Sequence, residues 1–226
     1  MASPAATSAV PVPVHAELAP RPGSRSGTTA QSVVLVDAGG TNIGSVRYAL
    51  QRLGIDAALA TDAATIAGAD KVILPGVGAA APAMRRLREL GLVEVLRAVT
   101  RPVLGVCLGM QLLCAHSQEG DVDCLGLIDA PVRRLPAAAG LRVPHMGWNS
   151  LAATRAHPLL QGLHDGDRAY FVHSYAVPTG DFTLAACDHG GAFSAVIASG
   201  NFYGAQFHPE RSAAVGARLL RNFLAL

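Results

Sequence analysis

Short apolar runs alternate with longer amphipathic segments along the first half of the chain. An unbroken run of four or five apolar residues is typical of a strand buried on both faces, whereas apolar positions three or four apart predict a helix with one buried side. The runs predict strands at residues 33–37, 71–74 and 103–106, and the periodic segments predict helices at residues 43–53 and 84–99. This order predicts βαβ units and a parallel sheet.

The second half is richer in strand patterns. Four further strands are predicted, at residues 170–174, 182–186, 193–198 and 202–207, and Ser199-Gly200-Asn201 forms the turn between the last two. We therefore predict an α/β fold with an open, mostly parallel but mixed sheet flanked by helices. Ligands of such sheets usually bind at the carboxyl ends of the parallel strands.

A last helix closes the predicted fold. Its apolar face is formed by Val215, Leu219, Leu220 and Phe223, which recur at helical spacing. Ser212 precedes this helix, and serine is a favoured residue at the position that caps a helix N-terminus. We expect Ser212 to provide that cap.

The first 31 residues differ in kind from the rest. They are rich in Ala, Pro, Ser and Thr, and five prolines interrupt any periodic pattern. We predict a disordered extension at residues 1–31 and a single domain at residues 32–226. A secretory signal is not expected, because the arginines come late and prolines break the apolar stretch at residues 10–14.

Composition narrows the possible functions. The chain has 226 residues, half of them apolar, and a formal charge of +2 without a basic cluster, so neither nucleic-acid binding nor a membrane span is expected. The four cysteines lack C-x-x-C spacing, and we predict no metal site, disulfide framework or cofactor. A reducing cytoplasm fits this cysteine usage.

One of these cysteines stands on a glycine-flanked turn. Cys107 directly follows the predicted strand at 103–106, and glycines lie two residues to either side of it. This is the spacing of a nucleophile elbow, in which a strained residue is exposed at the end of a sheet and the next amide, that of Leu108, faces an oxyanion. A buried structural cysteine would be the ordinary explanation if the motif stood alone.

A histidine and a carboxylate near the C-terminus complete a candidate catalytic set. His208 and Glu210 are two residues apart, and on an extended segment both project from one face. Glu210 can then hold the imidazole while its other nitrogen addresses the sulfur of Cys107. We predict a Cys107-His208-Glu210 triad.

A third segment can contribute to the same site. The predicted strand at 71–74 continues into Pro75-Gly76-Val77-Gly78, a loop with little side-chain obstruction of its amides. A backbone N–H near Gly76 or Val77 can serve as a second oxyanion donor. An ordinary strand-ending turn is the alternative.

These segments resemble the class I glutamine amidotransferases, which have a flavodoxin-like fold. Within that family the chain is similar to the glutaminase subunits of imidazole glycerol phosphate synthase, from about residue 33 to the C-terminus. The resemblance rests on the elbow, the loop at 75–78, Pro144-His145-Met146-Gly147-Trp148-Asn149, Phe171-Val172-His173-Ser174-Tyr175 and Gln206-Phe207-His208-Pro209-Glu210. Arg211 stands where the family more often has lysine.

The resemblance implies a reaction and a partner. The family hydrolyses glutamine, with Gln111 and Ser174 helping to hold the substrate. The ammonia passes to a separate (β/α)₈ cyclase subunit, which makes imidazole glycerol phosphate and an aminoimidazole carboxamide ribotide from a phosphoribulosyl formimino precursor. Trp148, Asn149, Tyr170 and Tyr175 are expected at the interface with this subunit, although a core position is the alternative for Trp148.

Two other functions remain open from the sequence. The chain is alternatively the glutaminase component of another synthase, such as anthranilate synthase, or a non-catalytic interaction subunit that keeps the fold. The segment at 144–149 disfavours the first alternative, and the intact triad disfavours the second.

Overall fold

The computed structural model describes Met1 and residues 31–38, 42–136 and 140–226. Its main sheet has eight strands in the order β2-β1-β3-β4-β14-β13-β12-β9. The strands are β1 (Val33–Val36), β2 (Ala58–Ala60), β3 (Lys71–Gly76), β4 (Val103–Cys107), β9 (Ala152–Ala153), β12 (Thr183–Asp188), β13 (Ala192–Ser199) and β14 (Phe202–Ala205).

The first five strands of that order are parallel, and the last three pair antiparallel. The mixed, mostly parallel sheet that the sequence predicts is thereby confirmed. The predicted hairpin between residues 199 and 202 joins β13 to β14, with Gly200 at a φ of 57°. The observed strand bounds differ from the predicted ones by one or two residues.

Two smaller sheets lie beside the main one. A ribbon is formed by β8 (His145–Ser150) and β10 (Arg168–His173), and a four-stranded sheet has the order β11-β7-β5-β6. Its strands are β5 (Cys114–Ser117), β6 (Val122–Asp123), β7 (Ile128–Arg134) and β11 (Tyr175–Ala176).

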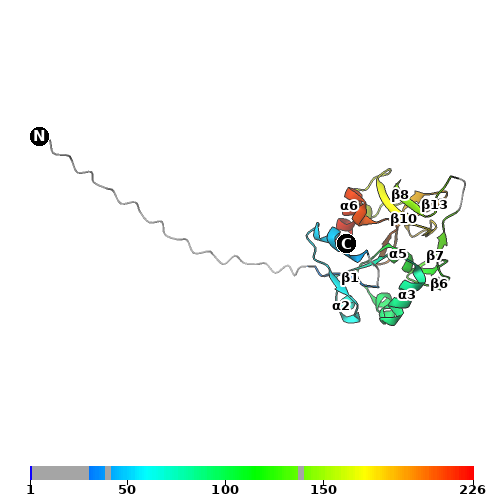
Figure 1. Cartoon of the computed structure of the whole chain (residues 1–226), viewed down its shortest axis with the longest axis horizontal. Helices are drawn as coiled ribbons and strands as arrows, with labels where there is room; N and C mark the ends of the chain where they lie inside the picture. Colours follow the sequence, from blue (N-terminus) through cyan, green and yellow to red (C-terminus); the bar gives the residue numbers. More distant parts are fainter. Residues whose placement is uncertain (2–30, 39–41, 137–139) are drawn as a thin grey trace. The chain divides into compact units, whose positions relative to one another are not determined.

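Helices cover both faces of the main sheet (Figure 1). They are α1 (Ile43–Gln51), α2 (Ala63–Ala67), α3 (Ala80–Glu89), α4 (Leu92–Ala98), α5 (Leu108–Leu112) and α6 (Ala213–Ala225), with short 3-10 turns η1 (Pro158–Leu160) and η2 (Pro209–Arg211). Within the described ranges, none of the helices has the length and apolar character needed to span a membrane.

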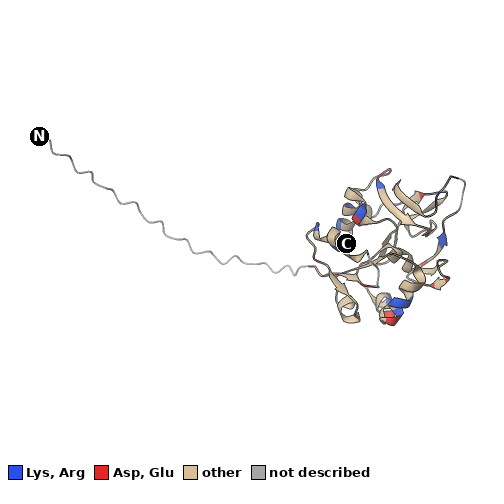
Figure 2. Cartoon of the chain, in the orientation of Figure 1, with Lys and Arg blue, Asp and Glu red and all other residues tan. Residues whose placement is uncertain are grey.

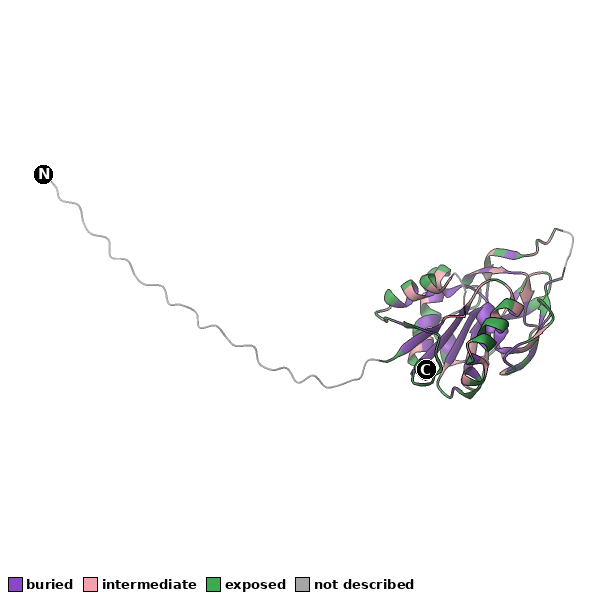
Figure 3. Ribbon diagram, turned by 60° about the horizontal axis from the view of Figure 1, so that its bottom comes forward, coloured by how far each residue is buried: buried purple, intermediate pink, exposed green. Residues whose placement is uncertain are grey.

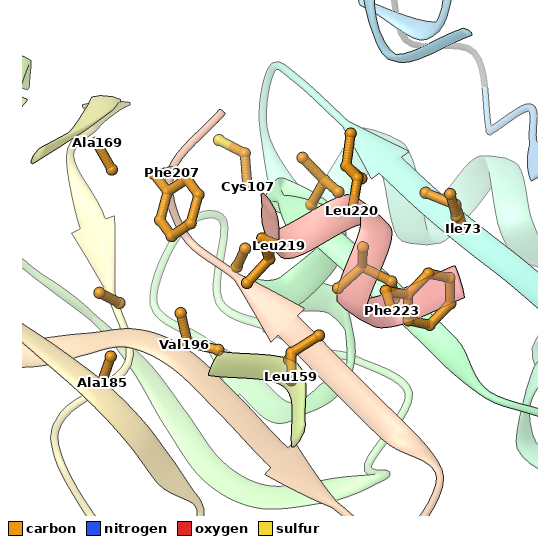
Figure 4. Packing of buried hydrophobic residues seen from close by; sticks show 14 of the residues in the cluster. Ile73, Cys107, Leu159, Ala169, Ala185, Val196, Phe207, Leu219, Leu220 and Phe223 are labelled. Carbon is orange, nitrogen blue, oxygen red and sulfur yellow. The ribbon is translucent and has the colours of Figure 1, made fainter. Parts of the chain in front are cut away.

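Two apolar cores result, one on each face of the sheet. Alternate residues of a strand point to opposite faces, so Leu35 joins the core under α1 and α6 while Val34 joins the core under α2, α3 and α4. Figure 3 shows the buried strands between helices whose outer sides are exposed. Leu219, Leu220 and Phe223 of α6 pack as one face, as their spacing predicts (Figure 4).

Two local predictions are wrong. The helix predicted at 84–99 is two helices, α3 and α4, because Gly91 adopts a left-handed φ of 67° and its amide bonds the carbonyl of Arg88. Ser212 precedes α6 but makes no cap hydrogen bond. Its hydroxyl instead donates to the carbonyl of His208 and accepts from the amide of Tyr170, which ties η2 to β10.

The extension predicted at 1–31 falls almost wholly outside the described residues and stays a prediction.

Among the described residues, α3 carries charges of both signs, from Arg85, Arg86, Arg88 and Glu89 (Figure 2).

Candidate active site

Cys107 lies where β4 ends and α5 begins, at the carboxyl end of the parallel strands. Its φ of 54° and ψ of −112° are strained for a residue with a side chain. A Cβ on Gly105 would come within 2.6 Å of the backbone of Gly109 and Met110. A Cβ on Gly109 would collide with the carbonyl of Leu74. The glycine spacing in the sequence is therefore required by close packing of the turn.

His208 and Glu210 form the second part of the site. Nδ1 of His208 lies 2.8 Å from Oε1 of Glu210, and only 7% and 2% of the two side chains are exposed. The contact that the sequence predicts is present, but Glu210 stands in the 3-10 turn η2 and not on an extended segment. Because Glu210 occupies Nδ1, Nε2 remains for the sulfur of Cys107.

Asn42 is a member of this cluster that the sequence reasoning missed. Its side-chain amide donates a 2.6 Å hydrogen bond to Oε1 of Glu210 and lies 3.4 Å from Nδ1 of His208. It comes from the start of α1, more than 160 residues away along the chain. No local pattern marks Asn42, because only the folded sheet brings it beside η2.

The charges of the pair stabilise each other. Burial alone would lower the pKa of His208, but hydrogen bonds with Cys107 and Glu210 and their negative charges outweigh it and raise this pKa to about 10. Burial alone would raise the pKa of Glu210, yet the hydrogen bond and charge of His208 and the amide of Asn42 hold it below its usual value. A protonated imidazole beside a thiolate is the arrangement that activates a cysteine nucleophile.

A cavity of about 280 Å³ opens at Cys107 and His208. Its lining includes Val77 and Gly78 of the predicted oxyanion loop, together with Leu108. Gly76 pairs with Cys107 in the β3–β4 register, and a Cβ on it would lie 2.8 Å from the amide nitrogen of Gly109. The loop and the elbow are thus held in direct contact.

The two predicted substrate residues also line this cavity. Gln111 is 4% exposed, and its side-chain amide donates to the carbonyl of Tyr175 at 2.8 Å and to Oε1 of Gln206 at 3.0 Å. Ser174 follows β10 and borders the cavity beside His173 and Tyr175. Gln206 also approaches Cys107, with Nε2 at 3.9 Å from the sulfur.

Glu119 is the one carboxylate in the described lining of the cavity, and sequence reasoning missed it. Its Oε2 accepts a 3.0 Å hydrogen bond from the amide of Ala80 at the start of α3. Burial raises the pKa of Glu119, partly offset by that amide. A half-buried carboxylate of this kind favours a cationic group in the cavity.

The remaining cysteines lie elsewhere in the core. Burial raises the pKa of Cys114, Cys124 and Cys187 to about 12, 11 and 12 respectively. They are therefore poor nucleophiles. Within residues 31–38, 42–136 and 140–226, no cluster of His, Cys, Asp or Glu side chains is arranged to hold a metal ion.

Of the four residues expected at a subunit interface, three lie on the two faces of the β8–β10 ribbon, and the fourth, Tyr175, lies in β11. Met146 and Trp148 are 64% and 45% exposed, and Tyr170 lies edge-on to Trp148 at 5.9 Å between ring centroids. Arg211 stacks 4.7 Å above the Tyr170 ring. Asn149 points to the other face and bonds His145 and the carbonyl of Asp188, while Tyr175 lies at the cavity.

Known proteins are similar to this chain in sequence and in fold. Residues 34–226 match the family model described as glutamine amidotransferase class-I. In solved structures, a glutamine amidotransferase is 24% identical, with a TM-score of 0.67, covering 86% of this chain and 98% of that one. A chain of the PurLQS structure from Thermotoga maritima is 18% identical, with a TM-score of 0.65, covering 86% and 98% of the two chains. These structures support the fold.

Curated relatives are much closer in sequence. The imidazole glycerol phosphate synthase subunit HisH of Xanthomonas euvesicatoria is 62% identical over 194 residues, which cover 86% of this chain and 97% of the relative. The HisH subunit of Xylella fastidiosa (strain Temecula1) is 60% identical over the same shares. The chain therefore belongs to the class-I glutamine amidotransferase family, and within it to the HisH subunits of imidazole glycerol phosphate synthase.

Proposed function

We propose that Cys107, His208 and Glu210 hydrolyse glutamine to glutamate and ammonia for the synthase to which this HisH subunit belongs. The observation that carries the proposal is the buried His208–Glu210 pair, 2.8 Å apart, beside a cysteine on a strained turn. Asn42 is assigned to orient the Glu210 carboxylate. The burial, hydrogen bonds and charges of His208 and Glu210 all favour proton transfer by His208.

The reaction has two halves. The Cys107 thiolate attacks the side-chain amide carbon of glutamine, and the N–H groups of Leu108 and of the Gly76–Val77 segment meet the negative charge on the oxygen. Loss of one such donor costs about 3 kcal/mol of transition-state stabilisation. His208 gives its proton to the amide nitrogen, which then leaves as ammonia. A thioester between Cys107 and the glutamyl group remains. His208 then takes a proton from water, whose attack releases glutamate and regenerates the thiolate.

Three residues of the cavity are assigned to substrate binding. Glu119 pairs with the α-ammonium group of glutamine, because it is the carboxylate that the described lining offers. Gln111 fixes the carbonyl of Tyr175 in the cavity wall, and Ser174 offers a hydroxyl beside it. No cofactor takes part in this scheme.

The partner is a (β/α)₈ cyclase subunit that uses the ammonia to make imidazole glycerol phosphate and the aminoimidazole carboxamide ribotide. The exposed side of the β8–β10 ribbon, with Met146, Trp148 and Tyr170, is assigned to this contact, since large aromatic anchors are enriched at interfaces. Asn149 and Tyr175 lie behind this surface and are assigned a supporting role in the contact. A heterodimer in the cytoplasm completes the proposal.

Labelling with a chloroketone analogue of glutamine tests the site. Mass spectrometry of the full chain is expected to find one adduct, on Cys107, that excess glutamine prevents. The buried Cys114, Cys124 and Cys187 provide internal controls and are expected to stay unmodified. An adduct that glutamine does not prevent, or one on another cysteine, contradicts the assignment.

A further inference from the structure

Two buried histidines lie on the inner face of the β8–β10 ribbon, and one of them, His173, also lines the glutamine cavity. The proposed reaction gives neither of them a role. His145 and His173 are 4% and 6% exposed and face each other across the ribbon. Nδ1 of His145 lies 3.1 Å from Nε2 of His173. Their rings pack against Phe171 and Phe193, so each ring nitrogen needs a partner to offset its lost hydration.

The outer partners determine where the protons lie. The carbonyl of Tyr175, 2.9 Å from Nδ1 of His173, can only accept, so that nitrogen carries a hydrogen and Nε2 of His173 is an acceptor. Nδ1 of His145 must then donate to it. Nε2 of His145 accepts in turn from the Asn149 amide at 3.3 Å. One assignment satisfies every bond, with both rings neutral and protonated on Nδ1.

The series of hydrogen bonds continues to the nucleophile. The Tyr175 carbonyl also accepts from Gln111, whose amide donates its second hydrogen to Gln206. The amide of Gln206, which is fully buried, is directed at the sulfur of Cys107. Burial lowers the pKa of His145 to about 4 and that of His173 to about 3, so both rings stay neutral near pH 7.

We infer that His145 and His173 are positioning residues that connect strand β8 to the wall of the glutamine cavity. They act through the Tyr175 carbonyl, which holds Gln111 and, through it, Gln206 beside Cys107. Met146 and Trp148 lie on the outer face of β8, and Asn149 and His145 lie on its inner face. A partner that contacts the outer face is therefore only one residue along the strand from the hydrogen bonds of Asn149. The inference deepens the proposed function of this site and rests on it.

Substitutions at His145 test the connection. His145→Phe keeps the ring and its stacking on His189 and Phe171, 4.1 Å and 4.9 Å away, but removes both hydrogen bonds. His145→Asn places an amide nitrogen near the position of Nδ1 and retains the donor to His173. The matched control is His189→Phe, because the His189 ring belongs to the same stack, while its one side-chain hydrogen bond within the described residues goes to the Arg142 carbonyl.

Glutamate release by the full chain with its cyclase subunit is measured over a range of glutamine concentrations. His145→Phe is expected to lower kcat/KM about tenfold, mainly by raising KM, because a buried acceptor on His173 loses its donor and the cavity wall relaxes. His145→Asn is expected to recover at least half of that loss on a logarithmic scale. His189→Phe is expected to stay within twofold of the parent.

Two outcomes of the activity measurements overturn the inference. One is equal activity of His145→Phe and His189→Phe, and the other is no recovery in His145→Asn. Because a variant can fail to fold, ¹⁵N NMR of the parent chain gives an independent test: both rings are expected as neutral Nδ1–H tautomers, and an Nε2–H tautomer at either ring contradicts the scheme. Failure of the proposed function would appear differently, as glutamate release that persists at the parental rate when Cys107 is replaced by alanine.

Discussion

Replacing Gly105 by alanine perturbs the elbow without touching any reacting group. The new Cβ would lie 2.6 Å from three backbone atoms of Gly109 and Met110, whereas ordinary contact begins near 3.4 Å. The turn must therefore retreat by about 0.8 Å, the difference between those two distances. These backbone atoms belong to α5, which begins directly after Cys107, so Cys107, the proposed nucleophile, moves with them.

The magnitudes follow from this displacement. Overpacking against backbone costs about 3 kcal/mol, at the upper end of its usual range. For a chain of this size that lowers Tm by roughly 6–12 °C. A nucleophile misplaced by nearly 1 Å loses on the order of 100-fold in rate. We expect Gly105→Ala to show both effects, measured by differential scanning calorimetry and by glutamine-dependent glutamate release.

Gly44→Ala is the matched control, because Gly44 lies in α1, has no positive φ, and a Cβ there would meet no atom within 4 Å apart from the adjoining backbone of its own helix. Alanine is a better helix former, so a gain of about 0.5–1 kcal/mol is expected. The reasoning is refuted if Gly105→Ala keeps the parental Tm and kcat/KM, or if Gly44→Ala is equally destabilising.

Three further predictions concern binding, pH and the chain start. Glu119→Gln is expected to raise KM for glutamine about 10- to 100-fold through loss of a charged hydrogen bond; an unchanged KM refutes its assignment to the α-ammonium. The native state keeps His145 and His173 neutral to about pH 4 and 3, whereas the unfolded chain takes up their protons below about pH 6.5. Stability therefore falls as the pH drops through that window, and a flat urea midpoint from pH 6.5 to 4 contradicts it. Removal of residues 2–30 is expected to leave Tm and activity unchanged, and a large drop in either refutes the predicted unpacked extension.

Features set by local spacing could be predicted from the sequence. The parallel strands β1, β3 and β4 are runs of buried residues, as predicted, whereas the short edge strand β2 has only Ala60 buried and was not predicted. The elbow is marked by Gly105 and Gly109, whose missing side chains the close packing requires. His208 and Glu210 stand two residues apart, so their contact was predictable even though η2 differs from the expected extended segment.

Features that depend on distant neighbours could not be predicted. Asn42 and Glu119 reach the site only through the order of strands, and neither belongs to a local motif that marks its role. Serine is a favoured cap residue, but the Ser212 hydroxyl instead accepts a hydrogen bond from the amide of Tyr170 and donates one to the carbonyl of His208. A single glycine such as Gly91 is tolerated within a helix, so the sequence is compatible with a continuous helix, but in the structure the left-handed conformation of Gly91 divides it in two.

The measurement that tests the central claim most directly is synthesis by the Cys107→Ala complex with its cyclase subunit, using either glutamine or added ammonium as the nitrogen source. Only the glutaminase half-reaction uses the thiol, so the account predicts that glutamine-dependent synthesis is abolished while ammonium-dependent synthesis equals that of the parent complex. Loss of both activities would show that Cys107 supports the structure of the complex, and retention of glutamine-dependent synthesis would show that another group is the nucleophile.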